Sequence, residues 1–106
     1  MIKHIVMWKL KDFAEGADKV QNARRMKIDL EALKATIPQI KHIEVGVNYI
    51  SSDAAYDVAL YSEFESEKDL ELYQKHPEHL RIAEFIGKIR EQRAVVDYRE
   101  MSSRKI

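Results

Sequence analysis

Hydrophobic patterning constrains the fold of this chain more than any other feature of its sequence. Four segments, at residues 3–10, 40–50, 56–64 and 94–99, are rich in apolar and β-favouring residues and are predicted as strands. Between the first and second strands, and again between the third and fourth, apolar residues recur at the spacing of a helix. The order β-α-β-β-α-β predicts an α+β, ferredoxin-like sandwich, in which a four-stranded antiparallel sheet has its helices on one face.

The first helix is predicted over residues 18–37. Asp18 is its expected N-cap, because Gln21 follows three residues later as in a capping box. Pro38 is expected to end the helix, because the residue before a proline avoids the helical region. The predicted apolar face consists of residues three or four apart: Val20, Ala23, Met26, Leu30, Leu33 and Ile37.

The second helical region is predicted in two parts that meet at Pro77. Ser66 is the expected N-cap of the first part. His76 precedes the proline and therefore avoids the helical region, whereas a proline suits the first position of a new helix. The second part is predicted to end near Gly87 or Arg90.

The first strand carries large apolar side chains on both of its faces, with Val6 and Trp8 on one and Ile5 and Met7 on the other. Both faces are therefore expected to be covered. The helices cover only one face of the sheet, and a second copy of the chain is the simplest cover for the other. We therefore predict a closed, symmetric homodimer through the open sheet face. The alternative is a monomer with a mildly apolar open face.

Composition excludes several classes of protein. Lys+Arg and Asp+Glu number 18 each, and this zero net charge argues against binding to nucleic acid or to an anionic membrane surface. The chain contains no cysteine, which excludes disulfides, thiolate zinc sites and cysteine nucleophiles. No apolar run approaches the roughly 20 residues of a membrane span, and the first residues do not resemble a signal peptide. We therefore expect a cytoplasmic protein.

Length and patterning predict a single domain over residues 1–100, followed by a disordered tail at residues 101–106.

Gly46, in the middle of the second strand, predicts a bulge or a close approach of the backbone. The three glycines are far apart in the sequence, so there is no phosphate-binding loop. The third strand lacks the Arg/Lys-Gly-aromatic run of RNA-recognition domains, which share this order of elements.

Three histidines and one tyrosine are the candidate functional residues. Tyr73, His76 and His79 lie three residues apart across the predicted helix break, and His4 lies on the strand face that the helices would cover. Two imidazoles and a phenol around an apolar pocket would suit a general base with an oxyanion-stabilising donor. Neither a cysteine nor an evident third ligand accompanies the histidines, so no metal site is predicted.

Each of these residues also has a simpler, structural interpretation. His76 would close the first part of the helix and face water, and His79 would be a core histidine bonded to a backbone carbonyl. Tyr73 would be a core aromatic, and His4 an ordinary strand residue. Spacing alone does not decide between the two interpretations.

Several segments of the sequence match a known family in order and spacing. They are IKHIVMWKL at residues 2–10, IPQI at 37–40, LYQKHPEH at 72–79 and VVDY at 95–98, of which the third is the most specific. By these segments the chain resembles the stress-responsive A/B barrel (Dabb) family over residues 2–99.

The resemblance implies a ferredoxin-like protomer that forms a dimeric α/β barrel. Most members have no known activity, some plant members are stress-induced, and others are polyketide cyclases. In the cyclases a tyrosine and a histidine of the second-helix motif serve the chemistry, and a histidine of the first strand lines the pocket. The resemblance therefore implies that Tyr73 and His79 are catalytic and that His4 binds substrate, with His76 in a lining role. Trp8, on the same strand face as His4, is a further substrate-binding candidate.

The first helix departs from the cyclase pattern, because residues 18–37 contain no aromatic residue to form the pocket wall. Polyketide cyclisation is therefore not inferred. The predicted function is a small-molecule enzyme without a cofactor or metal, a cyclase, lyase or isomerase that acts on a small apolar or aromatic ligand in a Tyr/His pocket. The alternative is a non-catalytic homodimeric module for stress response or ligand binding, with structural histidines.

Overall fold

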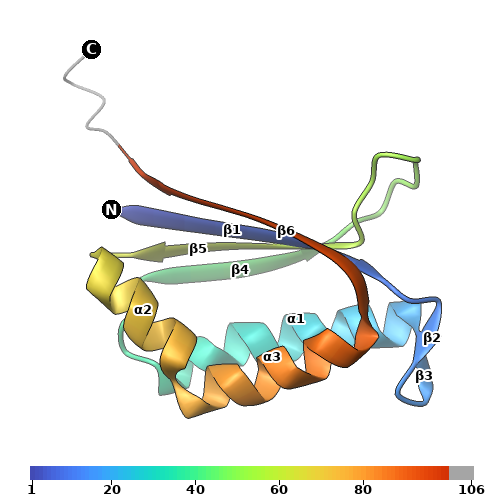
Figure 1. The fold of residues 1–106 in the computed structure, drawn as a ribbon, viewed down its shortest axis with the longest axis horizontal. Helices are drawn as coiled ribbons and strands as arrows, with labels where there is room; N and C mark the ends of the chain where they lie inside the picture. The colour runs from blue at the N-terminus through green and yellow to red at the C-terminus, as the bar shows by residue number, and fades with distance from the viewer. Residues whose placement is uncertain (101–106) are drawn as a thin grey trace.

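The fold is a four-stranded sheet with the helices on one of its sides (Figure 1). The structure, a computed structural model, describes residues 1–100. The sheet has the order β4-β5-β1-β6, and every neighbouring pair is antiparallel. Its strands are β1 (Ile2–Leu10), β4 (His42–Val47), β5 (Val58–Phe64) and β6 (Arg90–Arg99). The helices are α1 (Lys19–Thr36), α2 (Glu67–Lys75) and α3 (Pro77–Ile89). This arrangement confirms the predicted ferredoxin-like sandwich, and the predicted tail at 101–106 lies outside the described residues.

A short hairpin lies between β1 and α1, where the sequence predicted only a turn. It consists of β2 (Phe13–Ala14) and β3 (Ala17–Asp18). Glu15 and Gly16 connect the two strands with φ angles of 51° and 76°. A two-residue hairpin turn requires positive φ at such positions, and glycine adopts this conformation without a steric penalty.

Helix α1 begins at the predicted capping box. The Asp18 side chain accepts a hydrogen bond from the Gln21 N–H at 2.8 Å, and the Gln21 side chain accepts one from the Asp18 N–H at 3.0 Å. The predicted apolar face is buried except for Val20, which is 62% exposed. The rotation of the helix places Asn22 inward instead, where its amide donates to the carbonyl of Ala14 at 3.0 Å.

The second predicted strand is shorter than expected, and Gly46 within it has regular strand pairing. Strand β4 ends at Val47, and residues 48–57 form an extended loop on the open side of the sheet (Figure 1), in which Tyr49 is 91% exposed. Gly46 pairs with Ala59 in an unbroken ladder, so the bulge predicted there is wrong. The register shift that the sheet does contain lies in the ladder between β1 and β6, where Lys9 pairs with Gln92 and Leu10 with Arg90, so that Glu91 of β6 is the extra residue.

The core lies between the sheet and the helices, and it fixes the positions of the candidate residues. His4, Val6, Trp8 and Leu10 are buried on the helix-facing side of β1, whereas Met7 on the other side is 39% exposed. The predicted break between α2 and α3 is confirmed, with Pro77 as the first residue of α3. Within residues 1–100, no helix is both long enough and apolar enough to cross a membrane.

Candidate functional site

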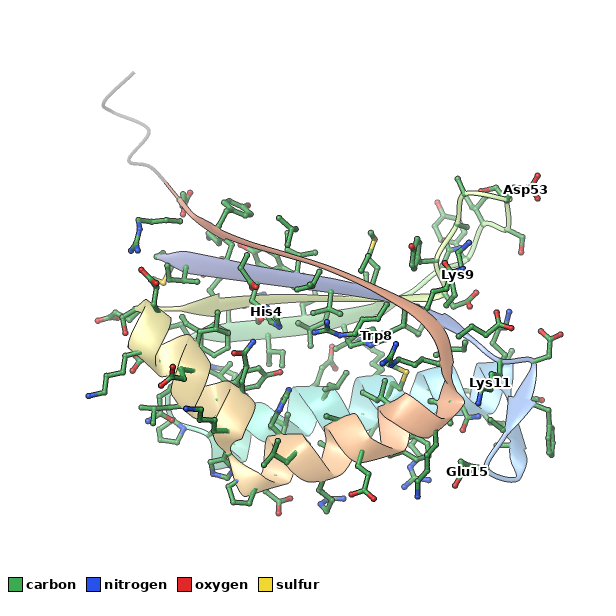
Figure 2. The ribbon with its side chains drawn as sticks, viewed as in Figure 1. His4, Trp8, Lys9, Lys11, Glu15 and Asp53 are labelled. Carbon is green, nitrogen blue, oxygen red and sulfur yellow. The ribbon has the colours of Figure 1, made fainter. Side chains whose placement is uncertain are left out.

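A cavity of about 310 Å³ lies between the sheet and the helices. Its apolar wall includes Val6, Trp8 and Leu60 from the sheet, Leu30 from α1 and Ile86 from α3. Figure 2 shows His4 and Trp8 on the helix side of the sheet, where this cavity lies. The volume is at the lower end of the range for sites that bind small molecules, and a mostly apolar wall with a few polar groups is typical of them.

Three of the predicted residues, His4, Tyr73 and His79, meet at this cavity. The centroid of the Tyr73 ring lies 4.5 Å from that of His79 and 6.3 Å from that of His4. The chain changes direction between α2 and α3, and this brings His79 back beside Tyr73, which belongs to the preceding helix. On its other side the Tyr73 ring packs against Phe64, with 4.9 Å between centroids. Trp8, also predicted, lines the same cavity.

His79 is held so that one ring nitrogen is available. Its Nδ1 is hydrogen-bonded to the backbone carbonyl oxygen of Gln74 at 3.1 Å. A carbonyl oxygen only accepts, so Nδ1 carries the hydrogen and Nε2 of the neutral ring keeps the lone pair. Burial lowers the pKa of His79, the bond to Gln74 partly opposes this, and the neighbouring His4, Arg93 and His76 lower it further. His79 is therefore neutral at pH 7 and able to accept a proton at Nε2.

Tyr73 is a buried hydrogen-bond donor. Burial raises the pKa of its hydroxyl above the ordinary value of 10.0, and the charge of Arg93 opposes this only in part, so the group is protonated at pH 7. Every fully buried polar side-chain atom in residues 1–100 has a hydrogen-bond partner. No group in this part of the chain bonds to the Tyr73 hydroxyl, so this hydroxyl is accessible from the cavity.

His4 is oriented by a carboxylate from the neighbouring strand. Its Nδ1 is hydrogen-bonded to Oδ1 of Asp97, which lies opposite it in the ladder between β1 and β6. The His4 side chain is 4% exposed, whereas that of Asp97 is 44% exposed. Because an ionised carboxylate only accepts hydrogen bonds, Nδ1 of His4 carries the hydrogen and Nε2 is the free atom.

His76 does not line the cavity. Its backbone N–H donates to the carbonyl of Tyr73 at 3.2 Å and ends α2, while its Nδ1 accepts from the Glu78 N–H at 3.1 Å and caps α3. This use of the ring at a helix terminus agrees with the structural interpretation, and the geometry gives no support to the predicted substrate-binding role of His76.

Sequence reasoning missed three residues of β6, namely Arg90, Arg93 and Asp97. Arg90 and Arg93 line the cavity, and Asp97 bonds to His4. In the ladder Arg93 lies opposite Trp8, and Asp97 opposite His4. The alternation of the last strand contained part of this signal, because it places Arg93 and Asp97 on one face. Within residues 1–100, no three or more metal-ligating side chains cluster at a common point.

Comparison with known proteins identifies the relatives of this chain. The family model described as "Stress responsive A/B Barrel Domain" (Dabb) matches residues 2–100. A curated relative, a stress-response A/B barrel domain-containing protein of Arabidopsis thaliana, is 38% identical over 83 residues. That match covers 77% of this chain but 30% of the Arabidopsis protein, so the chain spans less than a third of that relative's length.

Solved structures with the same fold include two dimers. A dimeric protein of unknown function with a ferredoxin-like fold, from Bacteroides fragilis, is 39% identical with a TM-score of 0.80, and the match covers 92% of this chain and 93% of that one. A dimeric ferredoxin-like protein of unknown function from Thermobifida fusca is 25% identical with a TM-score of 0.77, covering 92% and 88%. A hydroxynitrile lyase from Passiflora edulis has a TM-score of 0.73 over 92% and 90% of the two chains; at 22% identity this likeness shows the fold alone.

Proposed function

Because this chain belongs to the stress-responsive A/B barrel domain family, we propose that its cavity is the active site of an enzyme without a bound cofactor. The proposed chemistry is proton transfer at a carbon atom next to a carbonyl group, a step common to many cyclases, lyases and isomerases. The observation that carries this proposal is the convergence of His4, Tyr73 and His79 on one cavity of about 310 Å³. The large apolar residues of the cavity wall are buried, so the reacting atoms would lie against an apolar surface.

In the proposed step, His79 is the base and Tyr73 stabilises the product of proton removal. Nε2 of His79 takes a proton from the carbon, and the electrons of the broken C–H bond form an enolate whose charge lies on the carbonyl oxygen. The protonated hydroxyl of Tyr73 donates a hydrogen bond to that oxygen. His79 then returns its proton to another carbon or to a leaving group. His4, oriented by Asp97, is a second polar contact for the substrate.

Hydrogen–deuterium exchange tests this step without knowledge of the natural substrate. Small carbonyl compounds are incubated with the protein in D2O, and the loss of the proton signals next to the carbonyl is followed by NMR. We expect His79→Gln to slow exchange by about 10²–10⁴-fold, and Tyr73→Phe by about 10²–10³-fold. His42→Gln is the matched control, because His42 lies near Tyr61 on the open face of the sheet, at 5.8 Å between ring centroids. Unchanged exchange in His79→Gln would remove His79 from the mechanism.

A second candidate function is a non-catalytic module for ligand binding or stress response. The observation that favours it is that Nδ1 of both His4 and His79 already has a protein partner. Under this alternative, His79→Ala lowers the free energy of unfolding by about 1–3 kcal/mol, because it leaves a backbone carbonyl without its donor. No compound would then show exchange above the rate in buffer, and the effect of His79→Ala would be seen in urea denaturation and not in exchange.

We also propose that two copies pair through the open face of the sheet. Met7 and Val96 expose 39% and 52% of their surface there, and the solved relatives from Bacteroides fragilis and Thermobifida fusca are both described as dimeric. In the ladders Met7 lies between Ala59 and Ala94, and Ala59 lies beside Gly46. These small residues leave hollows of about 380 and 140 Å³ on the two sides of Met7, into which side chains of a second sheet would fit.

Charge on the open face is compatible with burial against a second copy. Nζ of Lys3 donates to the Tyr61 hydroxyl at 2.9 Å and to the Glu63 carboxylate at 2.7 Å, and it lies 3.2 Å from Oε1 of Glu100, so the charge of this lysine is paired. Sedimentation tests the dimer, with Met7→Glu expected to give the 12.4 kDa monomer because it places a charge in the apolar centre of the face. Leu80→Glu makes the same change at an exposed position of α3 and should remain dimeric. A monomeric mass for the unaltered protein at micromolar concentration would contradict the proposal.

A further inference from the structure

We infer that the ligand of this cavity carries a carboxylate on a small apolar body, and that Arg93 is the residue that selects it. The inference rests on the proposed function of the cavity and adds to it the chemical class of the ligand. Three features support it: the charge of the lining, the position of Arg93 and the direction of α3.

The lining of the cavity contains positive groups and no carboxylate. Its polar members are the guanidinium groups of Arg90 and Arg93, the imidazoles of His4 and His79, and the hydroxyl of Tyr73. Strand β6 carries two carboxylates: Glu91 does not line the cavity, and Asp97 is bonded to His4 and lines a separate hollow between α2 and β6. The chain as a whole has a formal net charge of zero, so this cavity is a local concentration of positive charge.

Arg90 has a structural role at the end of α3, whereas Arg93 is an exposed residue that lines the cavity without an ion-pair partner in residues 1–100. Arg90 is the C-cap of α3, where a positive side chain is favourable beside the unpaired carbonyl groups of the helix end. Arg93 lies farther along β6, opposite Trp8. The arginine ion pairs found within residues 1–100 involve other residues: Arg25, Arg81 and Arg99.

Arg93 also shares the cavity with the proposed reacting groups. Its charge contributes to the pKa values of both Tyr73 and His79, lowering each. An arginine with no acidic partner in residues 1–100, which lines the same cavity as a base and a hydrogen-bond donor, is placed to bind an anion. A guanidinium offers two parallel N–H donors that match the two oxygens of a carboxylate.

The direction of α3 favours a carboxylate over a phosphate. Gly87 and Arg90, at the C-terminal end of α3, line the cavity. The carbonyl groups at a helix C-terminus carry partial negative charge, which disfavours a dianion, and protein phosphate sites commonly use the opposite end of a helix. A monoanionic carboxylate held by one guanidinium meets less repulsion.

Trp8 provides a direct readout of binding, because it is the only tryptophan in the chain and lines the cavity. The probes are 3-phenylpropionate, its neutral amide 3-phenylpropanamide, and phenyl phosphate, each titrated into the millimolar range while Trp8 fluorescence is recorded. We expect 3-phenylpropionate to bind about 10- to 100-fold more tightly than the amide, as a charge-assisted hydrogen-bond pair would predict.

Substitution of Arg93 then tests its role. Arg93→Gln should weaken 3-phenylpropionate by about 10- to 100-fold and remove the preference for the acid over the amide, while Arg93→Lys should retain part of it. Arg24→Gln is the matched control, since it removes the same charge from the outer face of α1, away from the cavity. Circular dichroism spectra of all variants establish that they are folded.

The outcomes separate this inference from the proposed function. If acid and amide bind equally and Arg93→Gln changes neither, the inference is wrong, while the cavity stands as a binding site. Tighter binding of phenyl phosphate than of 3-phenylpropionate overturns the choice of carboxylate. If no probe changes Trp8 fluorescence or shifts the imidazole NMR signals of His4 and His79, both the inference and the small-molecule site are refuted.

Discussion

Gly87→Ala should stabilise the protein, because the fold itself gives no reason for a glycine at this position. Gly87 lies within α3, and its φ is not in the left-handed region that favours glycine. A methyl group added there would meet no heavy atom within 4 Å, so alanine brings no steric conflict. The substitution therefore acts mainly through backbone entropy, which costs glycine more than alanine on folding.

The expected gain is about 0.5–1 kcal/mol in the free energy of unfolding, which is the usual difference between glycine and alanine in a helix. For a domain of this length, 1 kcal/mol corresponds to a rise in Tm of about 4–8 °C. Urea denaturation and thermal unfolding measure this gain in stability. Both are done at one fixed protein concentration, because dimerisation makes the apparent stability depend on concentration. Gly16→Ala is the contrasting variant. Its φ of 76° is strained for alanine, so we expect a loss of about 1–2 kcal/mol.

A loss of stability in Gly87→Ala would refute the reasoning, because it would mean that a contact or backbone requirement exists at this position. The same residue also tests the cavity, which it lines. Gly87→Leu should remain folded and weaken the binding of 3-phenylpropionate, because its side chain would extend into the space. Unchanged binding in that variant would contradict the proposed position of the ligand. A glycine that lowers stability yet preserves a cavity is a typical trade between stability and function.

Three further predictions concern the histidines. His76→Ala should lower the free energy of unfolding by about 1 kcal/mol in urea denaturation, because it removes the N-cap of α3. His76→Asn keeps a capping group and should therefore keep most of the stability. If the stable His76→Asn variant no longer bound 3-phenylpropionate, His76 would have a substrate-binding role after all. Because the pKa of His79 is lowered on folding, the folded state binds protons less readily, so stability should be complete above about pH 6.5 and fall as the pH drops through the lowered pKa. His79→Gln should remove this part of the pH dependence of the urea midpoint. An unaltered pH profile in that variant would contradict the assignment of this pH dependence to His79. Asp97→Ala should cost about 1–3 kcal/mol, since the buried Nδ1–H of His4 loses its acceptor, and the ¹⁵N spectrum of the His4 ring should show mixed tautomers.

Local signals in the sequence predicted most of the fold. The capping box at Asp18 and the break at Pro77 each depend on a few neighbouring residues, so both could be predicted without knowledge of the tertiary structure. Helical spacing did not fix the rotation of α1, and Val20 was therefore placed in the core, whereas Asn22 is buried there. The hairpin of β2 and β3 was missed because strands of two residues are too short to show alternation.

The candidate site was only partly predictable, because its members come from distant segments. The motif around Pro77 indicated Tyr73, His76 and His79 together, yet only the orientation of α3 against the sheet separates the cavity residue His79 from the capping residue His76. Arg93 and Asp97 escaped prediction because their neighbours are set by the register between β6 and β1. Such a register joins residues about 90 positions apart, and no local pattern specifies it.

The same register gives the cavity two different ends, and this makes a final prediction about its ligand. Asp97 holds His4 near the start of β1, whereas Arg93 lies opposite Trp8, four residues farther along that strand. Four residues of strand span about 13 Å, and the arginine side chain covers only part of this distance. A ligand whose carboxylate meets Arg93 would therefore reach His79 and Tyr73 with a carbon several bonds away. In the series benzoate, phenylacetate and 3-phenylpropionate, affinity measured by Trp8 fluorescence should rise with chain length in the unaltered protein and stay flat in Arg93→Gln. A fall in affinity with length would place the anion directly beside the base, and the proposed separation of the two ends would be wrong.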